Sequence, residues 1–167
     1  LTGATNFGYD ANGNLLSVTD ARTNATVYTY DNMDRLATRK DPLLRTENYQ
    51  YDLAGNLTQF TDRKSQPTTY AYDALDRRTV TTFADGTTAT SEYDRDDNLV
   101  RVTDQNGSVV ARRYDGVNRL IAEDATRVAG VAGTTQRRYE YDGLSRLTRA
   151  TDNNDPANPN DDWKAAV

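Results

Sequence analysis

Polar and nonpolar side chains alternate along much of this chain with a period of two. In the stretch VYTYD, from Val27 to Asp31, Tyr28 and Tyr30 fall on one side of an extended backbone and Val27 and Thr29 on the other. The same spacing of tyrosines returns at Tyr49/Tyr51, Tyr70/Tyr72 and Tyr139/Tyr141. The pattern predicts short β-strands, each with one more apolar face.

A Tyr-Asp pair recurs at a fixed interval and divides the chain into equal units. The first six pairs are 21 residues apart and the seventh follows after 27, so six extra residues enter the last interval; we expect them as a longer loop in the Gly/Ala-rich segment 128–133. The tyrosines are Tyr9, Tyr30, Tyr51, Tyr72, Tyr93, Tyr114 and Tyr141.

Each Tyr-Asp pair has the composition of a β-turn. The Asp residues (Asp10, Asp31, Asp52, Asp73, Asp94, Asp115 and Asp142) are followed three positions later by Gly13, Asp34, Gly55, Asp76, Asp97, Asn118 and Ser145. A type I turn favours Asp at its first position, and Gly, Asn or Asp at its fourth position tolerates a positive φ. The pattern therefore predicts a chain reversal at every pair, entered by an aromatic anchor.

A finer alternation is superimposed on the repeat. Five residues after each tyrosine the chain reads Asn14, Arg35, Asn56, Arg77, Asn98, Arg119 and Arg146, so Asn and Arg alternate over six units with a period of 42 residues. The next position is Leu in every unit except the fourth, where it is Arg78.

Twenty-one residues suit a β-hairpin with its return turn, so we expect an all-β fold. The predicted architecture is a curved, antiparallel, single-layer ribbon of consecutive hairpins with about fourteen strands. We expect one array over residues 1–167, in which 152–167 form a loop and the start of a truncated further unit. Tyrosines of successive hairpins should lie side by side in rows that form the core, and each hairpin should depend on its neighbours for stability.

Composition supports a thin structure and removes several kinds of chemistry. Hydrophobic residues make up only 36% of the 167 positions, but eleven tyrosines argue against disorder. Cysteine and histidine are absent, which excludes disulfides, thiolate metal sites and histidine-based catalysis. We expect no enzyme activity and no cofactor. The longest apolar runs are too short to cross a bilayer, so membrane insertion is not expected.

The stretch YDANGNLLSVTDARTNATVYTYDNMDRL resembles the tyrosine-aspartate (YD) repeats of bacterial Rhs proteins, which are similar to repeats of toxin-complex C components and of animal teneurins. The resemblance covers roughly residues 7–152. It implies a β-sheet that spirals into a hollow shell around a toxic polypeptide, on large secreted or cell-surface proteins. Asp41-Pro42-Leu43 and Asp155-Pro156-Ala157 do not continue into the DPxG boundary of that family, so self-cleavage is not implied.

Oxygen-rich side chains near the C-terminus leave a calcium site open as an alternative. The segment 151–163 carries Asp152, Asp155, Asp161 and Asp162, and Ca²⁺ accepts carboxylate and amide oxygens. The glycine and glutamate of an EF-hand are missing. We favour a solvated loop, because Asn, Asp and Pro suit turns for conformational reasons alone.

Three further functional interpretations are weaker than the structural one. Arg112-Arg113-Tyr114 and Arg137-Arg138-Tyr139 place cations beside aromatic rings, but a net charge of −5 opposes nucleic-acid binding, and cross-strand charge pairs explain the arginines. Carboxylate pairs such as Asp96-Asp97 coincide with turns, which explains them without catalysis. Open tyrosine rows would suit carbohydrate binding, whereas interdigitated rows would be core.

The sequence therefore favours a non-catalytic segment of an Rhs-type shell that encloses or presents a polypeptide cargo, such as a toxin, of the same parent protein. The chain starts in mid-pattern at Leu1, and we expect it to be part of something longer. Its open strand edges predict edge-to-edge self-association. The alternative is a recognition module that binds carbohydrate or a partner protein. The resemblance implies a secreted or cell-surface location in bacteria.

Overall fold

The computed structural model describes residues 3–130, 135–153 and 164–166, and every regular element in these ranges is a β-strand. The strands are β1 (Asn6–Tyr9), β2 (Leu15–Thr19), β3 (Ala25–Tyr30), β4 (Leu36–Lys40), β5 (Thr46–Tyr51), β6 (Leu57–Thr61), β7 (Pro67–Tyr72), β8 (Arg78–Thr82), β9 (Thr88–Tyr93), β10 (Leu99–Thr103), β11 (Val109–Tyr114), β12 (Leu120–Thr126), β13 (Gln136–Tyr141), β14 (Leu147–Asn153) and β15 (Lys164–Ala166).

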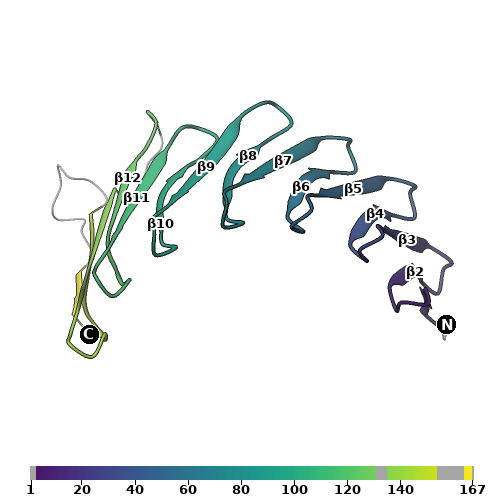
Figure 1. The fold of residues 1–167 in the computed structure, drawn as a ribbon, viewed down its shortest axis with the longest axis horizontal. Coiled ribbons are helices and arrows are strands. Elements are labelled where there is room, and N and C mark those ends of the chain that lie inside the picture. The colour runs from purple at the N-terminus through teal and green to yellow at the C-terminus, as the bar shows by residue number, and fades with distance from the viewer. Residues whose placement is uncertain (1–2, 131–134, 154–163, 167) are drawn as a thin grey trace. The chain divides into compact units, whose positions relative to one another are not determined.

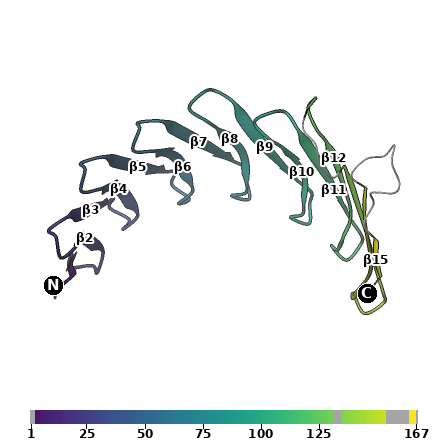
Figure 2. The same ribbon diagram turned by 180° about the vertical axis from the view of Figure 1, so that it is seen from behind.

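Two compact units divide the chain, residues 1–86 and 87–167. In the first unit β1 to β8 pair in chain order, each antiparallel to the next, and in the second unit β9 to β15 do the same (Figures 1 and 2). The prediction of an all-β fold of consecutive antiparallel hairpins is confirmed. Fifteen strands are described against about fourteen expected, because the chain returns as the three-residue β15 beside β14.

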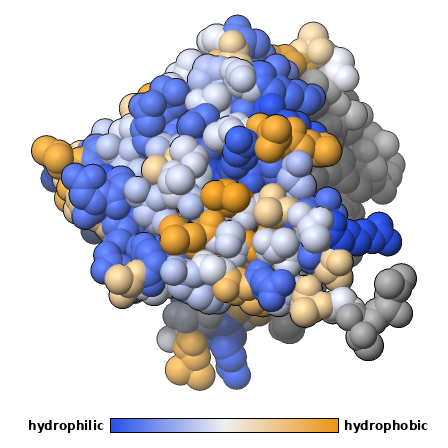
Figure 3. All heavy atoms as spheres, turned by 90° about the vertical axis from the view of Figure 1, so that its right-hand side faces the viewer, coloured by the Kyte–Doolittle hydropathy of each residue, from blue (hydrophilic) through white to orange (hydrophobic). Residues whose placement is uncertain are grey.

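Each unit is a single layer with almost no interior. Among the described residues only Ala122, Asp41 and Ser108 are buried. Figure 3 shows the resulting surface, on which hydrophobic residues form separate patches between hydrophilic ones. The thin structure expected from the low hydrophobic content is therefore what forms.

The two faces of the strands differ in burial as the alternation predicts. Along β3, Tyr28 and Tyr30 are half-buried, whereas Val27 and Thr29 are exposed. Tyr28 pairs with Arg39, and on the next hairpin Tyr49 pairs with Phe60, with ring centroids 5.1 Å apart. We call this side of the first unit, which carries Tyr28, Tyr49 and Tyr70, the aromatic face.

The interval between the last two Tyr-Asp pairs contains the predicted insertion. Strand β12 ends at Thr126 and β13 begins at Gln136, so the extra residues fall between these two strands, as expected from segment 128–133. Strand β14 continues to Asn153, which places Asp152 in a strand and not in the loop expected from position 152. The described residues include no helix with the length and hydrophobicity needed to span a membrane.

Candidate functional site

The turns that follow the Tyr-Asp pairs have the geometry that the sequence predicts. We call the five residues that begin at each of these Asp residues a Tyr-Asp turn. In the turn of residues 31–35, the backbone N–H of Asp34 donates to the carbonyl of Asp31 at 3.1 Å. The fourth residue has a positive φ in all seven turns, namely Gly13, Asp34, Gly55, Asp76, Asp97, Asn118 and Ser145. The turn prediction is confirmed at every position.

The Asp carboxylate that opens each turn accepts hydrogen bonds from the backbone inside the turn. Asp31 Oδ1 accepts from the N–H groups of Met33 and Arg35, at 2.9 and 3.0 Å. The same arrangement of partners two and four residues later occurs at Asp10, Asp73, Asp115 and Asp142. This carboxylate replaces the solvent that the turn amides would otherwise need, which explains the fixed Asp.

The alternating Asn and Arg residues fasten each Tyr-Asp turn internally and then join it to the next one. Within a turn, Asn14 Nδ2 donates to Asp10 Oδ2 at 3.0 Å, and Arg35 Nε donates to Asp31 Oδ2 at 2.8 Å. Between turns, Asn14 Nδ2 donates to Asp34 Oδ1 at 2.6 Å. Arg35 Nη1 donates to the carbonyl of Asp52 at 2.8 Å.

The bond to the next turn takes different forms at the Asn and Arg positions. An Asn reaches a side chain at the fourth position of the following turn, as Asn56 does with Asp76 Oδ1 at 2.7 Å. The longer Arg35 reaches a backbone carbonyl of a turn whose fourth residue is Gly55. Sequence reasoning found the alternation but missed this role, although the 42-residue period was a usable signal.

These hydrogen bonds hold the pKa of the turn carboxylates below the ordinary value. The side-chain hydrogen bond from Asn14 lowers the pKa of Asp10, and that from Arg77 lowers the pKa of Asp73, in both cases against the raising effect of burial. Burial acts to raise the pKa of Asp31 and Asp52, but their backbone and side-chain hydrogen bonds outweigh it and lower the pKa. At Asp115 and Asp142 the backbone hydrogen bonds from Arg119 and Arg146 lower the pKa most.

The tyrosine of each Tyr-Asp pair contacts the preceding hairpin through its hydroxyl group. Tyr51 Oη donates to the carbonyl of Leu36 at 3.1 Å. The equivalent bonds join Tyr30 to Leu15, Tyr72 to Leu57, Tyr114 to Leu99 and Tyr141 to Leu120. Tyr9, on the terminal strand β1, is 61% exposed. The regular Leu after each turn thus supplies a carbonyl acceptor on the neighbouring hairpin.

The expected rows of adjacent tyrosines take a different form. One returning strand lies between successive Tyr-Asp tyrosines, and the arginine that ends the turn before this strand fills the space. The Arg35 guanidinium lies 4.7 Å from the Tyr51 ring centroid, and Arg119 lies 4.8 Å from that of Tyr141. Cation–π contacts therefore alternate with hydrogen bonds where ring-to-ring contact was expected. The sequence prediction counted hairpins and overlooked the strand between them.

Return turns, which join one hairpin to the next, lie at the opposite ends of the strands from the Tyr-Asp turns. The return turn of residues 41–45 repeats the Asp arrangement: Asp41 Oδ1 accepts from the N–H groups of Leu43 and Arg45. Asp20, Asp62 and Asp104 act in the same way. The sequence analysis expected a return turn with each hairpin but assigned structural Asp residues only to the Tyr-Asp pairs.

A chain of ion pairs ties two neighbouring return turns of the first unit together. Asp41, whose side chain is 5% exposed, pairs with Arg45 at 2.7 Å and with Arg63 at 3.6 Å. Arg63 also contacts Glu47 at 2.7 Å, and Glu47 accepts from Tyr49 Oη at 3.1 Å. The Arg45 hydrogen bond lowers the pKa of Asp41. Burial acts to raise the pKa of Glu47, but its hydrogen bonds, led by that from Arg63, outweigh burial and lower it.

The paired arginines of the second unit are neutralised across strands, as predicted. Arg112 and Arg137 contact Glu123 at 3.0 and 3.2 Å, and all three share one face. Arg113 and Arg138 contact Asp124 on the other face. These contacts account for the Arg-Arg-Tyr sequences by charge pairing within the sheet.

Of the calcium alternative, only Asp152 lies among the described residues. It belongs to β14 and pairs with Arg137 at 3.6 Å. Asp155, Asp161 and Asp162 lie outside the described residues. Within the described ranges no three acidic side chains gather at a distance that would hold a metal ion.

Comparison with known proteins identifies the repeat. A family model described as RHS Repeat matches residues 9–46, 51–88 and 93–132, which together make up more than half of the chain. The chain belongs to the RHS repeat family. The boundaries of the matches fall at Tyr9, Tyr51 and Tyr93, so one RHS repeat corresponds to two of the 21-residue units and to one full Asn/Arg alternation. Comparison with curated proteins gives no match.

Solved structures show the same fold as this RHS repeat chain. The crystal structure of TcdB2-TccC3-Cdc42 matches with a TM-score of 0.73 at 18% identity, over 90% of this chain and 9% of that one. The crystal structure of TcdB2-TccC3 gives 0.70 at 16% identity, over 87% and 9%. The Photorhabdus luminescens Tc holotoxin pore with the TccC3 mutation D651A gives 0.71 at 16%, over 90% and 9%. The RHS repeat chain thus spans less than a tenth of these proteins.

Proposed function

We propose that this RHS repeat chain is a non-catalytic wall segment of a larger shell that encloses or presents a polypeptide cargo. The observation that carries the proposal is the row of Tyr-Asp turns, in which each turn is bonded internally and to the next, as Asn14 to Asp34 and Arg35 to Asp52. A single-layer sheet needs such bonds to keep neighbouring hairpins together at their turns, because no second layer packs against it. A hydrogen-bonded sheet keeps its backbone from proteases and excludes them from whatever lies behind it.

The solved structures that share this fold support the proposal, because they are complexes of large toxin proteins. Two of them are titled as complexes of TcdB2 with TccC3, and a third as a Tc holotoxin pore. Because this chain covers 9% of those chains, we propose that it forms one stretch of the shell wall of a larger protein, which is secreted or exposed on a bacterial surface. The cargo is an adjacent polypeptide of the same parent protein.

The recognition alternative draws less support from the same geometry. Platforms for sugar rings need open aromatic faces, but Tyr51 and Tyr141 are covered by arginine guanidinium groups and their hydroxyls are bonded to backbone carbonyls. A glycan array probed with the purified chain tests this alternative: saturable binding that is lost on Tyr→Ala substitution would favour recognition over the wall.

Site-specific photocrosslinking in the full-length protein tests the wall proposal. A benzophenone amino acid is placed at Tyr49, on the aromatic face, or at the adjacent Gln50, on the opposite face. A wall separates an inside from an outside, so we expect a crosslink to a second polypeptide segment from one of these positions only. Crosslinks from both positions with equal yield, or from neither, would contradict the proposal. The pair is matched because the residues are neighbours on β5.

A further inference from the structure

The return turn of residues 83–86 departs from the pattern of other return turns. Four return turns open with an aspartate, namely Asp20, Asp41, Asp62 and Asp104. At the equivalent position, 21 residues after Asp62, this turn has Phe83. The turn still forms, because the N–H of Gly86 donates to the carbonyl of Phe83 at 2.9 Å, but a phenyl ring cannot accept hydrogen bonds from the turn amides. Such a departure from a local rule is typical of a functional position.

Phe83 lines a hollow between this turn and return turn 62–66, which we call the acidic hollow. It has a volume of about 300 Å³, and the other residues that line it are Phe60, Asp62, Gln66, Thr68, Ala84 and Asp85. Phe60 pairs with Tyr49 and with Thr68, so the hollow lies on the aromatic face. Two of the three phenylalanines of the chain therefore line one hollow.

The lining of this hollow carries only negative charge. Asp62 and Asp85 belong to it, and no lysine or arginine is among the described residues that line it. The nearest basic residues along the chain are Arg63 and Lys64. Arg63 pairs with acidic side chains of the neighbouring interval, and Lys64 forms no ion pair within the described part of the chain. A cation from another polypeptide would therefore find rings and carboxylates without a competing cation in the lining.

Asp62 keeps one carboxylate oxygen available for such a partner. Its Oδ1 accepts from the backbone N–H groups of Lys64 and Gln66, at 2.8 and 2.9 Å. In return turn 20–24 the side chain of Asn24 also bonds Oδ2 of Asp20, at 2.9 Å. The Oδ2 atom of Asp62 accepts no hydrogen bond from the described residues. A donor from another molecule can use this oxygen while the turn stays intact.

Elsewhere in the chain, arginine fills sites that combine an aromatic ring with a carboxylate. Arg35 lies 4.7 Å from the Tyr51 ring centroid and donates to Asp31 Oδ2 at 2.8 Å. Arg119 lies 4.8 Å from the ring centroid of Tyr141. The acidic hollow supplies rings and carboxylates but no arginine. A guanidinium group suits it, because this group is planar, stacks on aromatic faces and donates several hydrogen bonds.

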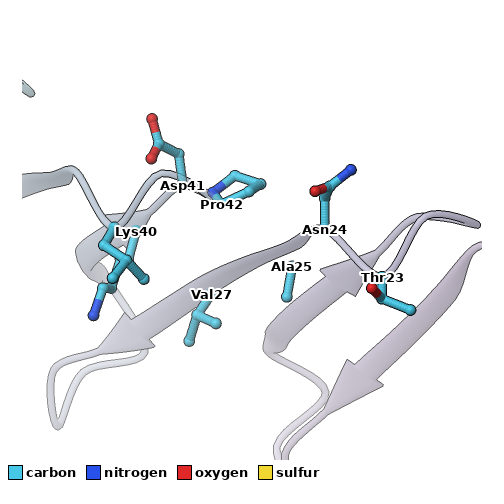
Figure 4. Close-up of a pocket in the computed structure, with 8 residues that line it drawn as sticks. Thr23, Asn24, Ala25, Val27, Lys40, Asp41 and Pro42 are labelled. Atoms are coloured by element: carbon cyan, nitrogen blue, oxygen red, sulfur yellow. The ribbon is translucent and has the colours of Figure 1, made fainter.

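The hollow between return turns 20–24 and 41–45 lacks these features. Its lining contains no aromatic ring, and its charged residues, Lys40 and Asp41, are opposite in sign. Figure 4 shows Ala25 and Val27 pointing to one side of β3, and Val27 is on the side opposite the aromatic face. The combination of rings with excess negative charge is therefore specific to the acidic hollow of these two.

We propose that the acidic hollow binds the arginine side chain of a polypeptide that lies against the aromatic face. The guanidinium group stacks on the rings of Phe60 and Phe83 and donates to Asp62 Oδ2. This inference rests on the proposed function, in which that polypeptide is the cargo, and it makes the aromatic face the inner face of the wall. A neutral sugar would gain nothing from the charge of the carboxylates, so the two kinds of ligand are separable.

NMR of the phenylalanine rings measures this binding, because the chain has three phenylalanines. The purified chain is isotope-labelled in these rings and titrated with acetyl-Gly-Gly-Arg-Gly-Gly-amide. We expect saturable shifts at Phe60 and Phe83 and none at Phe7, which lies on β1 and does not line the hollow. The same peptide with citrulline, the neutral isostere of arginine, should bind about tenfold more weakly.

Two variants test the hollow itself, with circular dichroism as the check of folding. Phe83→Asn supplies an acceptor oxygen to the turn, so the chain should remain at least as stable in urea while the peptide no longer shifts Phe60. Asp62→Asn keeps an oxygen for the turn amides but removes the charge, and should weaken binding of the arginine peptide about fivefold or more. Asp20→Asn, at the same position of a return turn that does not line this hollow, is the matched control and should leave binding unchanged.

Equal binding of the citrulline peptide would indicate a site for neutral polar groups such as sugars and would overturn the proposal. Unchanged binding in Phe83→Asn or Asp62→Asn, or equal shifts at all three rings, would do the same. The crosslinking experiment tests the wall separately. A crosslink from Tyr49 alone without peptide binding would retain the wall and overturn the arginine site. Peptide binding in the hollow with equal crosslinks from Tyr49 and Gln50 would support the arginine site and overturn the wall.

Discussion

Leu44 and Thr23 occupy the fourth position of return turns with φ values of +64° and +67°. At the equivalent position other turns have Gly13, Gly55 or Gly107, for which this conformation has no steric cost. A non-glycine residue in the left-handed region costs roughly 1–2 kcal/mol. The array therefore imposes the turn geometry, and Leu44 and Thr23 adopt the left-handed conformation although it is sterically unfavourable for them.

The first prediction follows at this position. Leu44→Gly removes the steric cost, and since the greater flexibility of glycine in the unfolded chain offsets part of the gain, we expect stabilisation of about 0.5–1 kcal/mol. Urea denaturation measures it. Gly55→Leu, at φ +98°, is the matched reverse substitution and should destabilise by at least 1 kcal/mol or so. A destabilising Leu44→Gly would show that Leu44 has a structural role after all.

The second prediction concerns the tyrosine hydroxyls. Tyr51→Phe removes the hydrogen bond to the carbonyl of Leu36 and should lower the free energy of unfolding by about 1 kcal/mol. Tyr70, whose hydroxyl forms no hydrogen bond within the described residues but whose ring contacts Arg78, serves as the control. Tyr70→Phe should change the stability by less than about 0.5 kcal/mol. Equal effects of the two substitutions would mean that the Tyr51 hydrogen bond contributes little.

Between hairpins, the link from one Tyr-Asp turn to the next depends on a donor that also faces carboxylates. Asn56 Nδ2 donates to Asp52 Oδ2 at 3.2 Å and to Asp76 Oδ1 at 2.7 Å. An acceptor in the same place would face two negative charges. In the intervals bridged by asparagine, the link between hairpins thus rests on one amide group.

The third prediction tests this link. Asn56→Asp replaces the donor with a carboxylate between Asp52 and Asp76, so we expect a loss of about 2 kcal/mol of stability at pH 7. The loss should shrink as the pH falls toward 4, because a protonated carboxyl group can donate again. Asn48→Asp, at an exposed position of β5 beside Thr38 and Thr61, is the control and should be nearly neutral. A pH-independent loss would contradict the proposed repulsion.

The hairpin is the scale at which the sequence was most informative. The period of 21 residues, the Asp at the turn entrance and the positive φ at Asp34 or Gly55 were predictable, because each depends only on neighbours along the chain. The contacts between hairpins were not. That Arg35 covers Tyr51 depends on which strand lies between them and on the reach of a side chain, and neither is a property of local sequence.

At the scale of the whole molecule, charge pairing is spread along the chain. Carboxylates with lowered pKa occur in both units, and Asp41 and Glu47 join two return turns through arginines. No large hydrophobic core supplements them, since Ala122 is the only buried hydrophobic residue among those described. Stability should therefore depend on pH more than in a protein with a thick core.

The fourth prediction is acid sensitivity. The ordinary pKa of Asp is 3.8 and the folded-state values lie below it, so the stabilisation is fully present above that pH and is lost as the pH falls through the folded-state values. We expect the urea midpoint to be constant between pH 7 and about pH 5 and to fall steadily below about pH 4. A midpoint that stays constant or rises down to pH 3 would contradict this account.

The Tyr-Asp turns and the return turns of the first unit differ in how well they should accept a longer loop. Along the Tyr-Asp turns every described interval is bridged, from Asn14 to Asp34, Arg35 to Asp52 and Asn56 to Asp76. Along the return turns, Arg63 bridges one interval, and hollows lie in the intervals on either side of it. The six additional residues of the chain fall between β12 and β13, which is a return connection. Insertions, whether evolved or engineered, should therefore be tolerated better in the return turns. A longer loop there leaves the hydrogen-bonded row of Tyr-Asp turns unchanged.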